Sequence, residues 1–360
     1  MNISGGSTFS VSRKSGQCRS GILADSCEIP IIPHCSDTSV NPNSYGVYRE
    51  GGFVKDMLTC IILFLLGILA FWLFAIAPQM HNRPDMRTWE KYDYAHRGLH
   101  NWEAGLPENS LPAFAKAVEG GFGVELDVRL TADNKIVVIH DSHLWRLCGV
   151  DNYVEKMTLK DLRSLKLQHS QERIPTLEEA LSVIGETTPV MVELKVENNN
   201  YELLCALTWS VMSSRPGQYS IQSFNPLAVR WFKEHQPSVI RGQLMQGTLP
   251  NNEIGQFQAF LGRNLFSNMF TRPNFESYNY QDRARASLWM AKNVLGMPEV
   301  SWTITDSETY ASLKKKGCII IFEGFHPLAQ SPQPDSTQPS METSPASMCS
   351  QLKIHNTGKR

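Results

Sequence analysis

The stretch GVELDVRLTADNKIVVIHD, from Gly123 to Asp141, combines two apolar runs with charged residues set inside and after them. Its first run alternates Glu125 and Asp127 with apolar neighbours, which is the period of a β-strand with two different faces. Both carboxylates therefore point to one face, where like charges repel and lose hydration unless a cation or another partner compensates them. The second run ends in His140, so this predicted hairpin carries acidic and titratable groups together.

Similar short apolar runs recur along residues 90–325, and amphipathic helical segments separate many of them. The predicted strands are 92–97, 124–130, 136–140, 190–194, 219–224, 240–244, 275–278, 301–305 and 318–322. The predicted helices include 110–119, 176–184, 201–213, 226–235, 281–293 and 307–316. This alternation predicts a parallel α/β domain, and its length favours a (β/α)8 TIM barrel over a doubly wound sheet. No glycine-rich phosphate loop follows a strand, which argues against a Rossmann or P-loop fold.

Three further segments flank this predicted barrel. Residues 1–56 lack apolar periodicity and are expected to be disordered, with Met57 as an alternative start of translation. Residues 57–77 carry no charge, and a helix of about 20 residues crosses a hydrocarbon core of about 30 Å, so we expect an uncleaved transmembrane helix. A cleaved signal peptide is the alternative. Residues 326–360 are rich in Ser, Pro and Gln and are expected to form a disordered tail.

Charge and cysteine usage restrict the partners. The net charge of −1 comes from an even mixture of both signs, so nothing indicates nucleic-acid binding. The eight cysteines include no CxxC pair, which gives no indication of a zinc site. A slight excess of basic residues after the apolar segment favours a single-pass membrane protein whose catalytic domain is cytoplasmic. The sequence identifies no protein partner, and the lipid bilayer is the partner expected for residues 57–77.

Polar residues gather where the predicted strands end, which is where TIM barrels carry their chemistry. They are His96 and Arg97, Glu125 and Asp127, His140, and Glu193 and Lys195. Each of these residues, taken alone, has an ordinary structural interpretation. Such interpretations do not explain why charged residues recur at successive strand ends. Carboxylates are hard oxygen ligands for Mg²⁺ or Ca²⁺, Arg and Lys attract phosphate, and two histidines can exchange protons near neutral pH. The set predicts metal-assisted cleavage of a phosphoester.

The order of these motifs resembles that of glycerophosphodiester phosphodiesterases. HRG begins at His96, PENS at Pro107, E-x-D at Glu125, HD at His140 and E-x-K at Glu193, and the resemblance covers roughly residues 92–325. It implies a barrel of the phosphatidylinositol-phospholipase-C-like type with a small insertion after the second strand, over about 142–173. Asn109 of the PENS motif is expected to reach the site, and Asp141 is expected to orient a neighbour.

The resemblance also implies roles for individual residues. His96 and His140 are the acid–base pair, with His96 favoured as the acid; Glu125, Asp127 and Glu193 bind the metal; Arg97 and Lys195 contact phosphate; Trp302 packs against the glycerol side of the substrate. The last strand departs from the family pattern, because an Asp usually stands where this sequence has Glu323.

The implied reaction is hydrolysis of a glycerophosphodiester to sn-glycerol 3-phosphate and an alcohol, with water or the neighbouring glycerol hydroxyl as nucleophile. Hydrolysis of lysophospholipids by the same site, as in a lysophospholipase D, is an alternative, since a membrane anchor would hold the barrel near lipid. A non-catalytic barrel that serves as a scaffold is a second alternative. Another metal-dependent phosphodiesterase of this fold, resembling phospholipase D-like toxins, is a third.

Overall fold

The computed structural model describes residues 50–168, 170–246 and 256–327. Most of the two segments expected to be disordered, 1–56 and 326–360, lies outside these residues, so those expectations remain predictions. The chain divides into two units at Thr59, and the fold below belongs to the unit that begins at Cys60. Of the first unit, the structure describes only the start of helix α1 (Glu50–Ile76).

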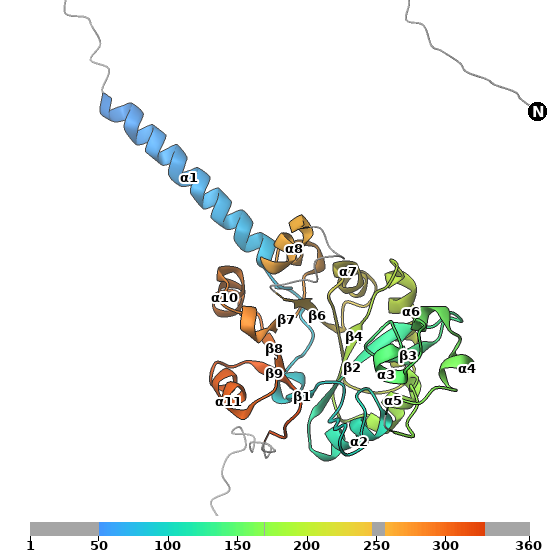
Figure 1. Ribbon diagram of the computed structural model, residues 1–360. Helices are drawn as coiled ribbons and strands as arrows, with labels where there is room; N and C mark the ends of the chain where they lie inside the picture. The colour runs from blue at the N-terminus through green and yellow to red at the C-terminus, as the bar shows by residue number, and fades with distance from the viewer. Residues whose placement is uncertain (1–49, 169, 247–255, 328–360) are drawn as a thin grey trace, which may run out of the picture. The chain divides into compact units, whose positions relative to one another are not determined.

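Eight parallel strands close into a barrel, which confirms the predicted (β/α)8 TIM fold (Figure 1). They are β1 (Tyr94–Ala95), β2 (Gly123–Leu130), β4 (Val190–Leu194), β5 (Tyr219–Ser223), β6 (Ile240–Met245), β7 (Phe275–Asn279), β8 (Glu299–Ile304) and β9 (Ile319–Phe322). Each pairs with the next in that order, and β1 pairs with both β2 and β9, so the ring has no open edge. The short β3 (Ile136–Val138) pairs antiparallel with β2, as the quoted stretch predicted.

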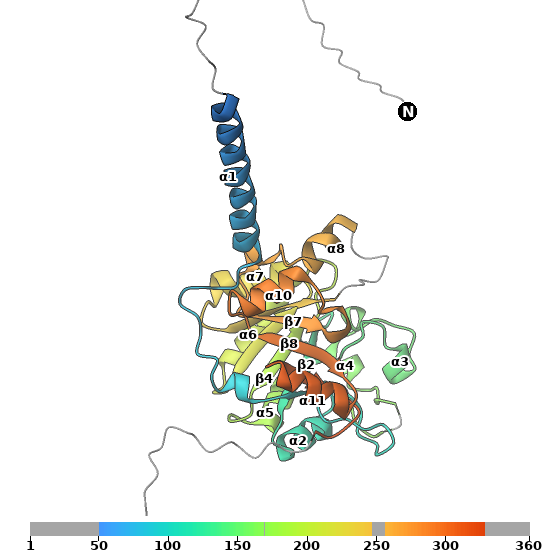
Figure 2. The ribbon, with the colours of Figure 1, turned by 90° about the vertical axis from the view of Figure 1, so that its left-hand side faces the viewer.

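Helices cover the outside of the strands. They are α2 (Leu111–Glu119), α5 (Leu177–Ile184), α6 (Tyr201–Ser213), α7 (Pro226–His235), α8 (Gln256–Arg263), α9 (Asn268–Thr271), α10 (Ala286–Asn293) and α11 (Ser307–Lys315). Figure 2 shows α10 and α11 outside the strands β7 and β8. Side-chain caps mark several starts: Thr176 and Glu179 form a capping box at α5, and Asp306 caps α11.

Strand alternation separates two apolar cores. Outward side chains, such as those of Val124 and Val192, pack in the cluster between the barrel and its helices. Inward side chains, such as those of Met191 and Phe275, fill the N-terminal half of the barrel interior. Trp89, in the turn η1 (Trp89–Lys91) before β1, closes this end: its ring centroid lies 4.6 Å from that of Phe275, and its Nε1 donates a hydrogen bond to Ser220 Oγ at 2.9 Å.

The segment between β3 and α5 forms a small subdomain, where an insertion was expected. It contains α3 (Trp145–Cys148), η2 (Val154–Lys156) and α4 (Leu159–Leu162). These short elements share their own apolar cluster, in which Leu144, Leu147, Val154, Leu162 and Ile174 are buried. The insertion is therefore packed as a unit beside the C-terminal end of β2.

Helix α1 contains the expected membrane segment but begins at Glu50, before the uncharged run starts, so residues 50–56 are helical and the prediction of disorder was wrong for them. An 18-residue window within Val54–Ile76 has a mean hydropathy of 2.8, so by length and composition the helix can cross a membrane. The last turn is tied to the barrel domain. Arg272 Nη1 donates to the carbonyls of Phe74 at 2.7 Å and Ala77 at 3.0 Å, which satisfies acceptors that a helix end leaves free.

Candidate active site

A pocket opens at the C-terminal end of the barrel strands. Its lining includes His96, Arg97, Glu125, His140, Glu193, Lys195, Gln222, Phe224, Leu244, Trp302, Thr303 and Ile321. Of the residues predicted to act in catalysis, metal binding or substrate binding, all but Asp127 line this pocket, and Asp127 lies fully buried beside Glu125 on the same face of β2. The structure therefore brings the predicted set together, because every parallel strand ends at the same rim.

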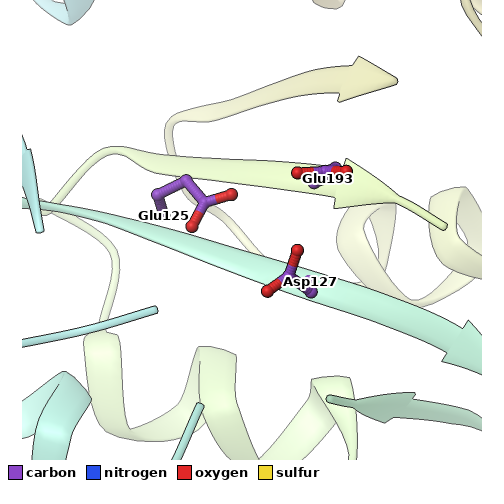
Figure 3. Close-up of side chains that lie close together, drawn as sticks. All are labelled: Glu125, Asp127 and Glu193. Carbon is purple, nitrogen blue, oxygen red and sulfur yellow. The ribbon is translucent and has the colours of Figure 1, made fainter. Parts of the chain in front are cut away.

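Three buried carboxylates meet at the base of the pocket. Glu125 and Asp127 project from β2, and Glu193 projects from β4, where it pairs in register with Asp127 (Figure 3). One oxygen from each lies within 4.8 Å of the other two. Glu125, Asp127 and Glu193 are each less than a tenth exposed. Such a set of hard oxygen donors fits a divalent cation.

The charges around these carboxylates are unevenly compensated. Lys195 Nζ lies 3.1 Å from Asp127 Oδ1 and 2.5 Å from Glu193 Oε1. Burial opposes ionisation of Asp127, yet Lys195, His140 and Arg97 together hold its pKa well below the usual range. Burial and the neighbouring Asp127 and Glu193 raise the pKa of Glu125 well above its usual value. Ionisation of Glu125 beside Asp127 and Glu193 therefore costs free energy, and a bound cation would offset that cost.

The HRG motif forms a tight turn beside β2. Arg97 has a φ of 56°, and its backbone N–H donates to Glu125 Oε2 at 3.1 Å. Gly98 has a φ of 79°, and a Cβ there would lie 2.8 Å from the backbone carbon of Ala113. Only glycine fits this close approach with a left-handed backbone. The strained turn thus places the Arg97 side chain over the carboxylates, with Nε 3.4 Å from Asp127 Oδ2.

The PENS motif supports the same carboxylates from the side. Asn109 Nδ2 donates to Asp127 Oδ2 at 2.9 Å, so Asn109 reaches the site as expected. The backbone N–H of Asn109 also donates to the Arg97 carbonyl at 2.9 Å. Ser110 then caps helix α2. The motif therefore links the start of a helix to the orientation of Asp127 and Arg97.

Both histidines are held by a carboxylate at Nδ1. His140 Nδ1 lies 2.7 Å from Asp141 Oδ1, and His96 Nδ1 lies 2.5 Å from Glu323 Oε2. Nε2 of each ring takes no part in these two contacts. Burial lowers the pKa of His96, and the hydrogen bond to Glu323 opposes that shift. Glu323, which departs from the family pattern, thus supplies a carboxylate directly after β9.

Aromatic and amide side chains form another part of the lining. Trp302 packs edge-on against Phe224, with ring centroids 5.8 Å apart. Gln222 on β5 donates from Nε2 to Glu125 Oε1 at 3.3 Å. Its buried Oε1 has no hydrogen-bond partner among the described residues, which makes it a free acceptor beside the carboxylates. The analysis of the sequence did not identify Gln222 as a site residue, although it lies near the end of a predicted strand, 219–224.

Other supporting residues were missed by the analysis of the sequence. Arg129 Nε donates to the His140 carbonyl at 2.8 Å, and His100 Nε2 lies 3.6 Å from Glu323 Oε1. Glu108 accepts from Arg97 Nη1 at 2.7 Å and from both Nη atoms of Arg146 at 2.8 Å. Because Glu108 belongs to the PENS motif, the sequence did contain a signal that could have identified it as a supporting residue. Arg146 stands in the insertion, and its spacing from Glu108 predicts no contact.

Fold and site together define a phosphodiester hydrolase built on a TIM barrel. The chain belongs to the glycerophosphoryl diester phosphodiesterase family, whose model matches residues 96–322. It is therefore a glycerophosphodiester phosphodiesterase by family and by relatives, as the motifs predicted.

Individual relatives agree with this assignment. The chain is 30% identical over 244 residues to YhdW of Bacillus subtilis (strain 168), a protein named provisionally as a glycerophosphodiester phosphodiesterase; the match covers 63% of this chain and 91% of YhdW. It is 32% identical over 156 residues to the lysophospholipase D GDPD1 of Rattus norvegicus, covering 39% of this chain and 48% of that protein. A phosphodiesterase of Oleispira antarctica, solved with the product sn-glycerol-3-phosphate, superposes with a TM-score of 0.54 at 26% identity, covering 64% of this chain and 92% of the other.

Proposed function

We propose that this protein hydrolyses glycerophosphodiesters to sn-glycerol 3-phosphate and an alcohol, with a divalent metal ion. One observation carries the proposal: the buried carboxylates of Glu125, Asp127 and Glu193 share a pocket with two histidines that are each held by a carboxylate. The product bound to the Oleispira antarctica relative supports the glycerol phosphate part of the substrate.

The two histidines are the proposed acid and base. One Nε2 removes a proton from the nucleophile, whose oxygen then bonds to phosphorus. If the nucleophile is water, sn-glycerol 3-phosphate forms directly; if it is the neighbouring glycerol hydroxyl, a cyclic phosphate forms and water opens it in a second step. As the P–O bond to the alcohol breaks, the other Nε2 gives a proton to the leaving oxygen, so proton and charge balance. Family resemblance favours His96 as the acid and His140 as the base. Asp141 and Glu323 would stabilise the ring that carries the extra proton.

The remaining polar residues would bind and neutralise the phosphate. Glu125, Asp127 and Glu193 would hold Mg²⁺ or Ca²⁺, which when bound supplies positive charge for the phosphate oxygens. Arg97 and Lys195 add two further positive charges at the same pocket. Trp302 and Phe224 offer an apolar surface for the carbon skeleton of the glycerol.

A lysophospholipid is the second candidate substrate. Helix α1 is long and apolar enough for a membrane anchor, and a curated relative is named lysophospholipase D. We propose that α1 anchors the protein in a bilayer as a single span with the barrel in the cytoplasm. Protease protection in sealed vesicles tests the topology. The vesicles are prepared with their cytoplasmic face outward, so a cytoplasmic barrel should be digested without detergent. Digestion of the barrel only after detergent is added would contradict this topology.

The experiment that tests the activity is a substrate panel on the full chain in detergent. Glycerophosphocholine, glycerophosphoinositol and lysophosphatidylcholine are each incubated with Mg²⁺, Ca²⁺, Mn²⁺ or EDTA, and the released glycerol phosphate or lysophosphatidic acid is measured. We expect turnover that requires a metal and that His96→Asn and His140→Asn each abolish. Absence of turnover with every substrate and metal would refute the proposal and favour a non-catalytic barrel.

A further inference from the structure

We infer that Arg146, in helix α3 of the insertion, is a positioning residue that holds His140 and Arg97 in one fixed arrangement through two carboxylates. Arg146 does not line the pocket, so it acts on the site only through other side chains. As an effect on catalysis the inference rests on the proposed function, but its structural part, the orientation of His140, can be measured without turnover.

The first link runs from Arg146 to His140. Arg146 Nε donates to Asp141 Oδ2 at 2.5 Å, while Asp141 Oδ1 lies 2.7 Å from His140 Nδ1. Each oxygen of Asp141 thus has its own partner. With one oxygen held by Arg146, the carboxylate cannot rotate freely, and the other oxygen stays directed at the imidazole. The orientation and tautomer of His140 therefore depend on a side chain outside the pocket.

The second link runs from Arg146 to Arg97. Arg146 donates from Nη1 to Glu108 Oε2 and from Nη2 to Glu108 Oε1, both at 2.8 Å. Oε1 of Glu108 also accepts from Arg97 Nη1 at 2.7 Å. Glu108 is 4% exposed, so its charge needs these partners. Burial opposes its ionisation, yet the two guanidinium groups lower the pKa of Glu108.

The arrangement uses all three nitrogens of one guanidinium group. A planar fork with fixed spacing holds Glu108 in a bidentate contact and still reaches Asp141 with Nε. A lysine at this position would keep the charge but has a single nitrogen, so it could not hold both carboxylates in the same geometry. The adjacent Leu147 is buried in the apolar cluster of the insertion, which holds α3 in place.

Arg163 provides a matched control. It lies in the same insertion, is partly exposed like Arg146 and pairs with a single carboxylate, that of Glu179 in α5. The variants are Arg146→Gln, Arg146→Lys and Arg163→Gln in the full chain. We expect kcat/KM to fall about 10- to 100-fold in both Arg146 variants, chiefly through kcat, and to stay within about twofold in Arg163→Gln. Thermal unfolding of all variants identifies any loss that comes from misfolding.

A double-mutant comparison tests the route through Asp141. In a Glu108→Gln background, where the link to Arg97 is already absent, Asp141→Asn combined with Arg146→Gln should lose little more activity than Asp141→Asn alone if Arg146 acts by holding Asp141. Losses that multiply would show that Arg146 does not act through Asp141 and would overturn that link. Turnover by Arg146→Gln equal to that of Arg163→Gln would overturn the inference as a whole.

A spectroscopic measurement keeps the inference separate from the proposed activity. The side-chain ¹⁵N signals of His140, assigned with His140→Asn, report which ring nitrogen carries the proton. We expect Arg146→Gln to change these signals and Arg163→Gln to leave them unchanged. An inactive wild type with the expected change would refute the proposed function and keep the positioning role. Unchanged His140 signals in Arg146→Gln would refute the positioning role even in an active enzyme.

Discussion

Glu323 Oε2 lies 2.5 Å from His96 Nδ1, although the two residues are separated by almost the whole barrel sequence. β9 is hydrogen-bonded to β1, and the backbone N–H of His96 donates to the Phe322 carbonyl at 2.9 Å. Closure of the barrel therefore completes the pair. His96 has its orienting carboxylate only when the last strand is in place beside the first.

Replacement of Glu323 tests this pair. Glu323→Gln keeps an acceptor for the Nδ1 proton but removes the negative charge that stabilises a protonated ring. We expect kcat to fall by roughly 100-fold or more, as expected when an orienting carboxylate is lost. Steady-state kinetics give the value, and Glu308→Gln, an exposed change in the first turn of α11, is the control. Wild-type kcat in Glu323→Gln would show that the contact has no catalytic role.

Metal binding should stabilise the fold through the three carboxylates. A ligand at 100 times its Kd adds about 2.7 kcal/mol to the free energy of unfolding. We expect the divalent ion that supports turnover to raise the Tm of the wild type, EDTA to reverse the rise, and Glu125→Gln and Asp127→Asn to abolish it. Calorimetry measures these shifts. Glu178→Gln, on the exposed side of α5, should respond like the wild type, and an equal rise in Asp127→Asn would place the ion elsewhere.

Glu299 on β8 should make stability depend on pH. Burial opposes its ionisation, but Arg283 and Lys292, at 2.8 and 2.9 Å, lower its pKa to about 2. Because the folded pKa is depressed, this stabilisation is present above the ordinary carboxyl pKa of 4.5 and is lost as pH falls toward about 2.

The variant Glu299→Gln isolates this contribution. We expect it to lower the free energy of unfolding at pH 7 by about 3 kcal/mol, since two partly buried cations lose their partner. The difference from the wild type should shrink steadily between pH 4.5 and the lowest pH at which both remain folded. Thermal unfolding across that range provides the comparison. A difference that stays constant with pH would mean that Glu299 stabilises by packing and not by charge.

Two glycines with left-handed backbones allow the cost of backbone strain to be distinguished from the cost of steric crowding. Gly98 has a φ of 79° and Gly149 a φ of 68°, but only Gly98 has backbone close to where a Cβ would stand. Gly149→Ala should cost about 1 kcal/mol. Gly98→Ala should cost at least about 2 kcal/mol, because the chain must also move away from Ala113. Unfolding measurements on both variants check the order, and equal losses would show that the contact with Ala113 relaxes without cost.

Much of the barrel could be predicted because the spacing of apolar residues along the sequence indicates its strands and helices. Alternation placed Glu125 and Asp127 on one face of β2, and the structure keeps them there with Glu193 from β4. The first strand was predicted too long, over 92–97, because Arg97 leaves the strand with a positive φ. The helix predicted over 281–293 starts later, at Ala286, since residues Tyr280–Asp282 form a separate turn.

The contacts between loops could not be predicted in the same way. Arg146 and Glu108 stand 38 residues apart, and they meet only because the insertion folds back over the loop before α2. No periodic pattern encodes such a path. The sequence showed that Glu323 departs from the family motif, but it did not show that His96 is the partner of Glu323. Helix α1 starts at Glu50, before the uncharged run. The absence of charge predicts only the apolar part of a helix, and it gives no indication of how far the helix extends into the residues before that part.

The Trp89 side chain at the N-terminal end of the barrel has a consequence for the end at which a substrate can enter. Trp89, Tyr94 and Phe275 fill the N-terminal end of the barrel, so among the described residues the pocket at the C-terminal end does not continue through to the other side. Under the proposed hydrolysis, the substrate would therefore enter and both products would leave at the C-terminal end of the barrel.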